Sequence, residues 1–459
     1  MLEVSLESLW SCDTQKTSPC LSPCRPSSQK PLTSVLPRLL LHLTLLGCLA
    51  TVLIVCLTAG QWPQHVMVPH LVTFSPLLHT RDDVTRPQEA PLTLQCRDVL
   101  ADMLDGEWHR LSDIHEQAMQ DLKLFLHTSR SQHSLPYGLQ RQDGRCGNVS
   151  FDELEGRMNN LHWFRALCDP DGDTPCCYEN SCVAKAVAEC RCDSCYDMRQ
   201  SIDAEFSEWK PRRPDCHVTR VQSPEAACHV LKNMTVYFIG DSFVRHLYIS
   251  LLDLLRLHTS YGPIKRFTPP GIIITQGCNH TANKQYPYLQ MCAKHIDRDV
   301  RECGGDVRLK FMEHIRAEHT NLTLKAVREI QGKENSFLFI GIGIHDDFNT
   351  TKIIKELVEP LLSLLKTSSS WPRVVWSAMH APGLLKTPRV PSQNRQSILR
   401  YNRDLRQLLG VWGVPVFDTF NLTDGTTSFD GAHYGKGVND VKAQVFLNYV
   451  LEQRGGAIR

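Results

Sequence analysis

The second half of the chain alternates apolar, β-branched runs with helical patterns, and this alternation restricts the possible folds most strongly. Five runs are predicted as strands: Met234–Gly240, Val307–His314, Ser336–Ile344, Arg373–His380 and Val414–Phe420. Four helices are predicted between or after them: Phe243–His258, Thr351–Lys366, Ser397–Gly410 and Lys436–Glu452. Such alternation predicts an α/β fold with a mostly parallel sheet between two layers of helices. Ligands of these folds bind beyond the carboxyl ends of the strands.

A second feature bears on location. The segment Leu39–Ala59 has no formal charge, and at helical rise it covers roughly 30 Å, the thickness of a bilayer core. Arg38 precedes it directly, and the next Lys or Arg after it is Arg81, so the positive-inside tendency predicts a type II anchor. The alternative is a cleaved signal peptide, for which the apolar run is long and starts late.

The cysteines and sequons agree with a lumenal body. Of the 19 cysteines, 14 follow the apolar segment, and an even, dense set is typical of disulfides formed in an oxidising compartment. Six Asn-x-Ser/Thr sequons, candidate glycosylation sites, all follow it too: Asn148, Asn233, Asn279, Asn321, Asn349 and Asn421. We therefore expect the protein in the secretory pathway, in the Golgi or at the cell surface.

These features divide the chain into five predicted parts. They are a disordered cytoplasmic tail at 1–38, the transmembrane anchor at 39–59, a stem at 60–95, a cysteine-rich lumenal subdomain at 96–230 and the α/β domain at 231–455. Two short amphipathic helices are expected between Arg97 and His127. The dense stretch Cys168–Cys195 is interpreted as disulfide-stapled, with a zinc site at Cys190, Cys192 and Cys195 as the alternative. The acidic run from Asp169 to Asp173 is interpreted as a turn, because its spacing departs from a calcium loop.

A serine stands where the first strand of the α/β domain meets its helix. In Gly240-Asp241-Ser242 the hydroxyl lies beside the unpaired N–H groups of a first helical turn, and these are ready donors for an oxyanion. The alternative is that Asp241 or Ser242 only caps the helix.

A possible base for this serine lies near the far end of the domain. Asp430 and His433 are three residues apart on the loop between the last strand and the last helix. Alone, this spacing is more typical of a surface histidine in a glycine-rich turn. Combined with Ser242 in this architecture, it predicts a nucleophile, a base and an orienting carboxylate.

These blocks resemble the SGNH/GDSL superfamily, and more closely its PC-esterase and trichome-birefringence-like branch, relatives of the sialate O-acetyltransferases. Glu208-Trp209-Lys210-Pro211 and Cys216, upstream of FIGDSFVRHLY, are similar to that branch's approach to its GDS block. The resemblance covers roughly residues 196–455. It implies a three-layer α/β/α SGNH-hydrolase-like domain, with Ser242 as nucleophile, His433 as general base and acid, Asp430 as its orienter and Asp241 as a structural member of the motif.

The chain departs from the superfamily where the oxyanion hole is usually completed. Residues 341–347 read GIGIHDD, without a Gly-x-Asn-Asp block, and Asn349 is a poor substitute because it heads a sequon. His345 either supplies a hydrogen-bond donor to the oxyanion or has a structural role, and Gly271 or Gly277 is a further candidate source of a backbone N–H. Arg245 and His246 face either the substrate or solvent. The candidates for oxyanion and substrate contacts are Gly240, Asp241, Gly343, His345 and Arg245.

The sequence thus predicts a membrane-anchored serine acyl-ester enzyme that acts on glycan O-acetyl groups as a transferase or an esterase. It predicts no bound cofactor and no metal; a transferase needs an acetyl donor such as acetyl-CoA as co-substrate. The expected partners are the membrane and a glycan, and the balance of 50 basic against 49 acidic residues gives no case for nucleic acid. The alternative is an inert glycan-binding or adhesion module with the same fold.

Overall fold

The structure, a computed structural model, describes residues 96–131, 135, 138–151, 160–192, 195–257, 262–266, 293–366, 370–387 and 389–455. All of them belong to one compact unit that begins at Pro87. The predicted tail, membrane anchor and stem lie outside these ranges. Within them, every helix is too short or too polar to cross a bilayer.

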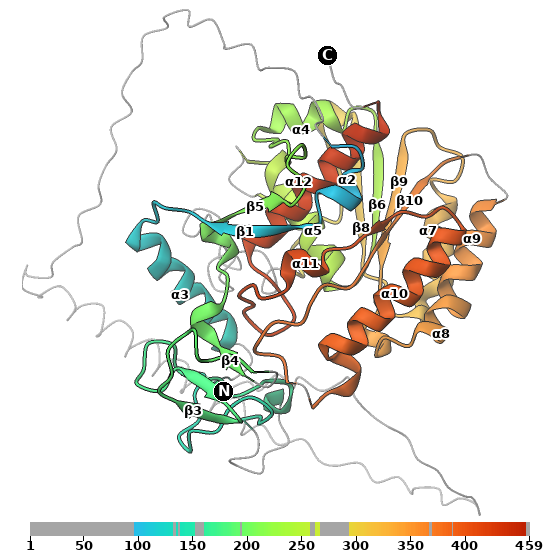
Figure 1. Cartoon of the computed structure of the whole chain (residues 1–459). Helices are drawn as coiled ribbons and strands as arrows, with labels where there is room; N and C mark the ends of the chain where they lie inside the picture. The colour runs from blue at the N-terminus through green and yellow to red at the C-terminus, as the bar shows by residue number, and fades with distance from the viewer. Residues whose placement is uncertain are drawn as a thin grey trace, which may run out of the picture. The chain divides into compact units, whose positions relative to one another are not determined.

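The centre of this unit is a six-stranded sheet (Figure 1). In spatial order its strands are β11 (Val416–Phe417), β10 (Arg373–Ser377), β9 (Ser336–Gly341), β6 (Thr235–Gly240), β8 (Val307–Met312) and β7 (Asp299–Glu302). The first five are parallel, and only β7 pairs antiparallel, with β8. The five strands predicted from the sequence are all present, whereas β7 was missed because its short run DVRE is too polar for a strand pattern.

Four of the predicted strands end earlier than expected, and β8 stops at Met312 instead of His314. β9 stops at Gly341 because the chain turns at Gly343–Asp346, and β10 stops at Ser377. Ala378, directly after β10, still donates its N–H to the Phe417 carbonyl at 3.1 Å, but the next N–H, of Met379, donates to the side chain of Asn402 at 3.0 Å. β11 keeps only two residues. The apolar residues past the strand ends are buried or half-buried without belonging to a strand, so the apolar pattern overestimated the lengths of the strands.

Helices cover both faces of the sheet, so the predicted layered arrangement is confirmed in part (Figure 1). Alternate residues of β6 point to opposite faces. Val236 and Phe238 join a core with α5 (Ser242–Leu255) and α12 (Lys436–Gln453), whereas Tyr237 and Ile239 join a second core. That second core contains residues of α7 (Thr320–Arg328), α9 (Glu359–Lys366) and α10 (Arg395–Val411). Further helical elements of this region are α8 (Thr350–Ile353), the π-helical turn Ile354–Val358 and α11 (Phe420–Thr423).

The residues before the sheet form short elements that pack on it. The two predicted helices are α2 (Val99–Asp102) and α3 (Glu116–Ser131), but β1 (Gly106–Arg110) lies between them and pairs with β5 (Ser207–Pro211). A small sheet follows, made of β2 (Cys176–Tyr178), β3 (Ser181–Val183) and β4 (Tyr196–Asp197). The helix α4 (Pro224–Val230) leads into β6. Contacts cross the predicted boundary at residue 230, because α2 and α4 both pack against α12.

Twelve of the 14 cysteines after the apolar segment are paired in six disulfides. The pairs are Cys96–Cys216, Cys146–Cys177, Cys168–Cys182, Cys176–Cys190, Cys192–Cys195 and Cys228–Cys303. The disulfide interpretation of the dense stretch is confirmed, since the three cysteines of the zinc alternative are all in disulfides. Cys278 and Cys292 lie outside the described residues.

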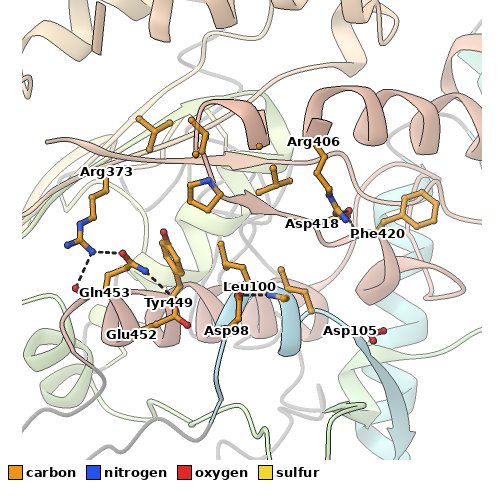
Figure 2. Close-up of a pocket in the computed structure, with 18 of the residues that line it drawn as sticks. Asp98, Leu100, Asp105, Arg373, Arg406, Asp418, Phe420, Tyr449, Glu452 and Gln453 are labelled. Carbon is orange, nitrogen blue, oxygen red and sulfur yellow. Dashed lines mark hydrogen bonds and ion pairs between the residues drawn. The ribbon is translucent and has the colours of Figure 1, made fainter. Parts of the chain in front are cut away.

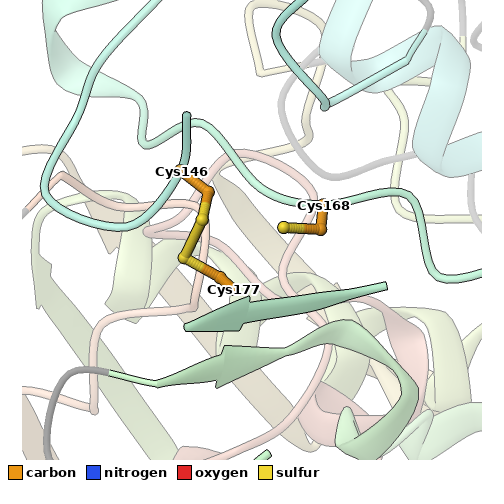
Figure 3. A group of neighbouring side chains, drawn as sticks. All are labelled: Cys146, Cys168 and Cys177. Atoms are coloured by element: carbon orange, nitrogen blue, oxygen red, sulfur yellow. A yellow bond between two sulfur atoms is a disulfide. The ribbon is translucent and has the colours of Figure 1, made fainter. Parts of the chain in front are cut away.

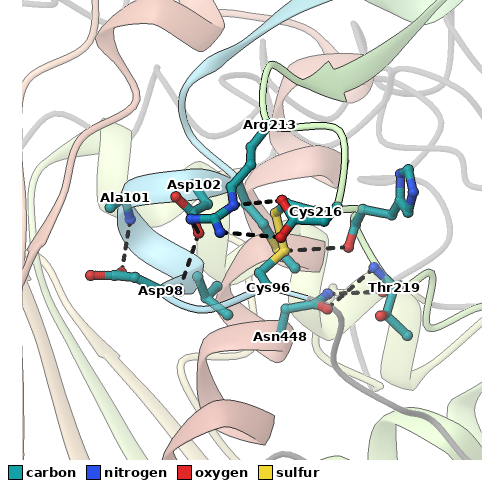
Figure 4. The surroundings of a disulfide bond; sticks show 12 residues. Cys96, Asp98, Ala101, Asp102, Arg213, Cys216, Thr219 and Asn448 are labelled. Atoms are coloured by element: carbon teal, nitrogen blue, oxygen red, sulfur yellow. Dashed lines mark hydrogen bonds and ion pairs between the residues drawn. A yellow bond between two sulfur atoms is a disulfide. The ribbon is translucent and has the colours of Figure 1, made fainter.

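Two views show how the disulfides tie the chain together. The sulfurs of Cys146, Cys168 and Cys177 gather within 4.8 Å of one another, but each is oxidised and therefore not a thiolate ligand (Figure 3). Cys96 joins Cys216 where the Asn448 side chain of α12 bonds to the backbone of Thr219 (Figure 4). This bond fixes the first described residues beside the last helix of the sheet region.

Candidate active site

The turn from β6 to α5 places Ser242 at the start of a helix. Asp241 is the N-cap, in extended conformation, and its Oδ1 accepts from the Phe243 N–H at 2.9 Å. Gly240 leaves no room for a side chain, since an added Cβ would lie 2.2 Å from the Gly341 carbonyl oxygen. Ser242 is therefore the first helical residue after a buried strand, with its side chain at the carboxyl end of the sheet.

Asp430 organises the loop between α11 and α12. Its Oδ1 accepts from the backbone N–H groups of Ala432 at 2.9 Å and His433 at 2.7 Å. Its Oδ2 lies 2.6 Å from His433 Nδ1. An ionised carboxylate only accepts hydrogen bonds, so Nδ1 carries the proton and Nε2 is left as an acceptor.

The fold brings this histidine to Ser242 across 191 residues of sequence. His433 Nε2 lies 2.7 Å from Ser242 Oγ, within reach of the hydroxyl proton. Serine, imidazole and carboxylate thus form one chain of hydrogen bonds. A nucleophile, a general base and an orienting acid need this arrangement.

Distant segments hold the loop. Gly383 N–H donates to the Gly431 carbonyl at 3.0 Å, and the Tyr434 hydroxyl donates to the Ala381 carbonyl at 2.7 Å. Gly431 has a φ of +82°, and an added Cβ would lie 2.6 Å from the Lys386 nitrogen. Glycine is required at this position both for its conformation and for the close approach.

Residues of the predicted cysteine-rich subdomain also support the loop between α11 and α12. Thr427 N–H donates to the Ile202 carbonyl at 2.8 Å, and Ile202 N–H donates to the Gly425 carbonyl at 3.0 Å. A carboxylate oxygen of Glu205 accepts from the Gly437 N–H at 3.1 Å, at the N-terminus of α12. Burial raises the pKa of Glu205 to about 7, although its bond from Gly437 acts in the opposite direction.

The predicted oxyanion candidates Gly343, His345 and Asp241 differ from one another in position and burial. Gly240 and Gly341 are partners in the register of β6 and β9, so Ser242 and Gly343 each lie two residues beyond that pair. His345 is half-buried, and its pKa is lowered by burial, then by Arg316 and His433. Asp241 is fully buried, and burial raises its pKa to about 6.

The remaining predicted positions are occupied by other contacts or lie outside the described residues. Arg245 is buried and ion-paired with Glu313, so the solvent alternative is wrong for it. His246 is buried with its ring centroid 5.0 Å from that of His433.

Asn349 caps α8, as its Oδ1 accepts from the Lys352 N–H. Gly271 and Gly277 lie outside the described residues. So does the sequon at Asn279, and the other five sequon asparagines are exposed.

Two residues near the loop were missed by sequence reasoning. His380 follows β10 and contacts the Ala432 carbonyl through Nε2 at 2.6 Å. Lys442, in α12, reaches His380 Nδ1 with its Nζ at 3.1 Å. Both are buried. The one signal in the sequence was Lys442, a lysine among the apolar residues of the predicted last helix. Lysines at the surface of a helix show the same pattern, so the signal did not mark a buried residue.

Two of the pockets in the described residues are relevant to the position of the triad. A small one of about 10 Å³ is lined by Phe243, Ile344, Phe348, His380 and Ala432, among others, and by none of the three triad residues. A groove of about 1110 Å³ lies beside the edge strand β11, between α2 and α10 (Figure 2). Its polar walls include the pairs Arg406–Asp418 and Arg373–Gln453, and none of the three triad residues lines it.

No protein-family model and no curated protein matches the sequence. Several solved structures align with about half of the chain. A lipolytic G-D-S-L family member from Veillonella parvula is 12% identical, with 48% of this chain and 97% of that one covered and a TM-score of 0.28, and a carbohydrate acetylesterase from Sinorhizobium meliloti is 12% identical, with 48% and 99% covered and a TM-score of 0.28. An acetyl xylan esterase from Geobacillus stearothermophilus is 18% identical, with 50% and 97% covered and a TM-score of 0.25. Similarity this low says nothing about what this protein acts on.

Proposed function

We propose that the protein is a serine acyl-ester enzyme with Ser242 as nucleophile, His433 as general base and acid, and Asp430 as the group that orients His433. One observation carries the proposal. Ser242 Oγ and His433 Nε2 are 2.7 Å apart, and His433 Nδ1 and Asp430 Oδ2 are 2.6 Å apart, at the carboxyl end of a central parallel strand. A capping role for Asp241 leaves Ser242 free to be the nucleophile, and a surface role for His433 does not explain both of its ring contacts.

The reaction proceeds in two halves. Ser242 Oγ attacks the acyl carbonyl carbon as His433 Nε2 takes the hydroxyl proton, and the carbonyl becomes a tetrahedral oxyanion. The C–O bond of an ester substrate, or the C–S bond of a thioester donor such as acetyl-CoA, then breaks, and His433 returns its proton to the leaving oxygen or sulfur. A water or sugar hydroxyl next attacks the acyl-enzyme in the same way, which gives hydrolysis or transfer.

The oxyanion is assigned to backbone N–H groups near the end of the sheet. Ser242 stands in the first turn of α5, where N–H groups have no partner within the helix. Gly343 stands equally far beyond the paired residues Gly240 and Gly341 on the neighbouring strand. Donors preorganised at such a position stabilise the transition state by several kcal/mol.

The substrate class is proposed to be O-acetyl groups, as the resemblance of the Ser242 and His433 blocks to glycan O-acetyl enzymes implies.

We further propose that the acceptor or substrate is a glycan, that a transferase would use an acetyl donor such as acetyl-CoA, and that a type II anchor places the enzyme in the secretory pathway. The exposure of five sequon asparagines and the six disulfides support the lumenal side. Endoglycosidase treatment of the expressed full chain should lower its apparent mass. An unchanged mass, with a C-terminal tag accessible from the cytosol, contradicts this location.

A serine-directed fluorophosphonate probe tests the activity itself. The purified lumenal part should be labelled at Ser242, and acetyl release or transfer should occur with at least one member of a panel of O-acetylated and unmodified glycans. A folded protein that is neither labelled nor active on any ester or glycan contradicts the proposal and favours the inert binding module.

A further inference from the structure

The two missed residues, His380 and Lys442, lie directly behind the triad. His380 Nε2 is 2.6 Å from the carbonyl oxygen of Ala432, the residue before His433. The imidazole ring also packs on the Phe243 ring, with centroids 3.6 Å apart, and Phe243 is the residue after Ser242. One buried side chain therefore contacts the neighbours of both the nucleophile and the base.

The hydrogen-bond roles follow from the partners. A carbonyl oxygen only accepts, so His380 Nε2 carries a proton. In the neutral imidazole Nδ1 is then an acceptor, and Lys442 Nζ donates to it at 3.1 Å. A doubly protonated ring would turn a second N–H toward the lysine and lose this bond. Lys442 thus selects the tautomer that binds the loop.

Burial and nearby charge are consistent with these roles. The pKa of His380 is held well below its usual value by burial and then by Lys442, which keeps the ring neutral. Burial lowers the pKa of Lys442 to about 7, and the charge of Asp241 acts in the opposite direction. An amine donates to Nδ1 whether or not it is charged, so the bond survives either state.

We propose that His380 and Lys442 are positioning residues for the triad: through the Ala432 carbonyl and the Phe243 ring they set the distance between His433 and Ser242. This inference rests on the proposed function. Neither residue contacts the reacting atoms. Their effect should therefore appear in the rate of Ser242 attack and not in the binding of substrate.

The variants separate positioning from general stability. His380→Leu keeps an apolar side chain against Phe243 but removes both hydrogen bonds, whereas His380→Gln keeps a terminal donor and acceptor. Lys442→Met keeps the length of the stem, and it serves if His380→Leu does not fold. The matched control is Gln444→Leu: Gln444 is also buried in α12 and makes two bonds, but to the backbone of Val221, away from the triad.

The main measurement is the second-order rate of fluorophosphonate labelling, with kcat and KM for an aryl acetate beside it. His380→Leu should lower the labelling rate and kcat roughly 10- to 100-fold with KM nearly unchanged, because small misplacements of reacting groups cost about this much. His380→Gln should recover most of the rate. Gln444→Leu should lower the melting temperature and leave the rate near that of the unchanged protein.

A second measurement needs no substrate. The proton between His433 Nδ1 and Asp430 should give a low-field proton resonance, which His380→Leu should weaken or shift and Gln444→Leu should not. The inference is overturned if His380→Leu, or Lys442→Met in its place, keeps both the resonance and the control's labelling rate. A chain that is never labelled refutes the proposed function, and the resonance alone then decides whether the pair positions His433.

Discussion

The two halves of the triad are built in different ways. Ser242 is held by consecutive residues: a buried strand, a glycine with no room for a side chain, an N-cap and a helix. Asp430 and His433 lie on a loop without regular structure, and its bonds come from Ile202, Gly383 and His380. The nucleophile half is therefore a local motif, and the base half is a product of tertiary packing.

This difference predicts how each half fails. A local motif survives changes elsewhere in the chain, because its hydrogen bonds close within a few residues. A loop held from three sides loses its geometry when any one support is removed, even where the protein stays folded. The predictions below start with the reacting groups and move outward through the supports of the loop.

The largest effect is expected when a reacting group is removed. Ser242→Ala or His433→Ala should lower turnover by about five to six orders of magnitude, and the double variant should lose little more, since the two act as one unit. Kinetics on folded variants measure this, with Ser250→Ala, a second buried serine of α5, as control. Near-normal turnover of a folded Ser242→Ala variant refutes the assignment of the nucleophile.

Asp430→Asn should cost less, about 10²- to 10⁴-fold in kcat. Oδ1 accepts two backbone N–H groups, so the amide oxygen should keep that position and turn the NH₂ toward His433 Nδ1. The ring would then carry its proton on Nε2 and could not accept from Ser242. Comparison of kcat with that of the parent tests this; equal values would show that Asp430 does not orient the base.

Gly431→Ala tests the tertiary support of the base half. The added Cβ would meet the Lys386 backbone at 2.6 Å in a conformation that favours glycine, so the loop must shift. We expect kcat to fall roughly 10- to 100-fold with a lower melting temperature. Gly410→Ala is the control, because an added Cβ there has open space. If both variants keep full activity, the loop is less constrained than its contacts indicate.

The smallest effect concerns stability and its dependence on pH. The folded-state pKa of Glu205, about 7, lies above the usual 4.5, so between these values the folded protein holds a proton that the unfolded chain releases. Stability from this group is therefore present at low pH and lost as pH rises toward 7. Glu205→Gln should match the parent at pH 4.5 and exceed it by on the order of 1 kcal/mol at pH 8. Denaturant melts at both pH values measure this; an equal difference at both contradicts the assigned pKa.

Much of the α/β architecture could be predicted from the sequence. The five parallel strands and the four predicted helices follow from local periodicity, since strands buried on both faces are continuous apolar runs, but α7 after β8 was missed. The strand ends were less accurate, because the chain beyond Gly341 and Ser377 stays buried or half-buried although it no longer belongs to a strand. β7, a polar edge strand, had no such signal.

The sequence by itself determined that Ser242 stands at a capped strand–helix junction, because cap, glycine and strand are neighbours in the chain. It also indicated disulfides, since cysteine number and spacing are local facts. Only the tertiary structure decided the pairing of those cysteines, the approach of His433 to Ser242 and the contact of Lys442 with His380. Lys442 and His380 are 62 residues apart in the sequence, and His433 and Ser242 are 191 apart. Both contacts therefore depend on how the helices and loops pack on the two faces of the sheet. No spacing along the chain encodes such contacts, because they are set by packing between distant segments of the fold.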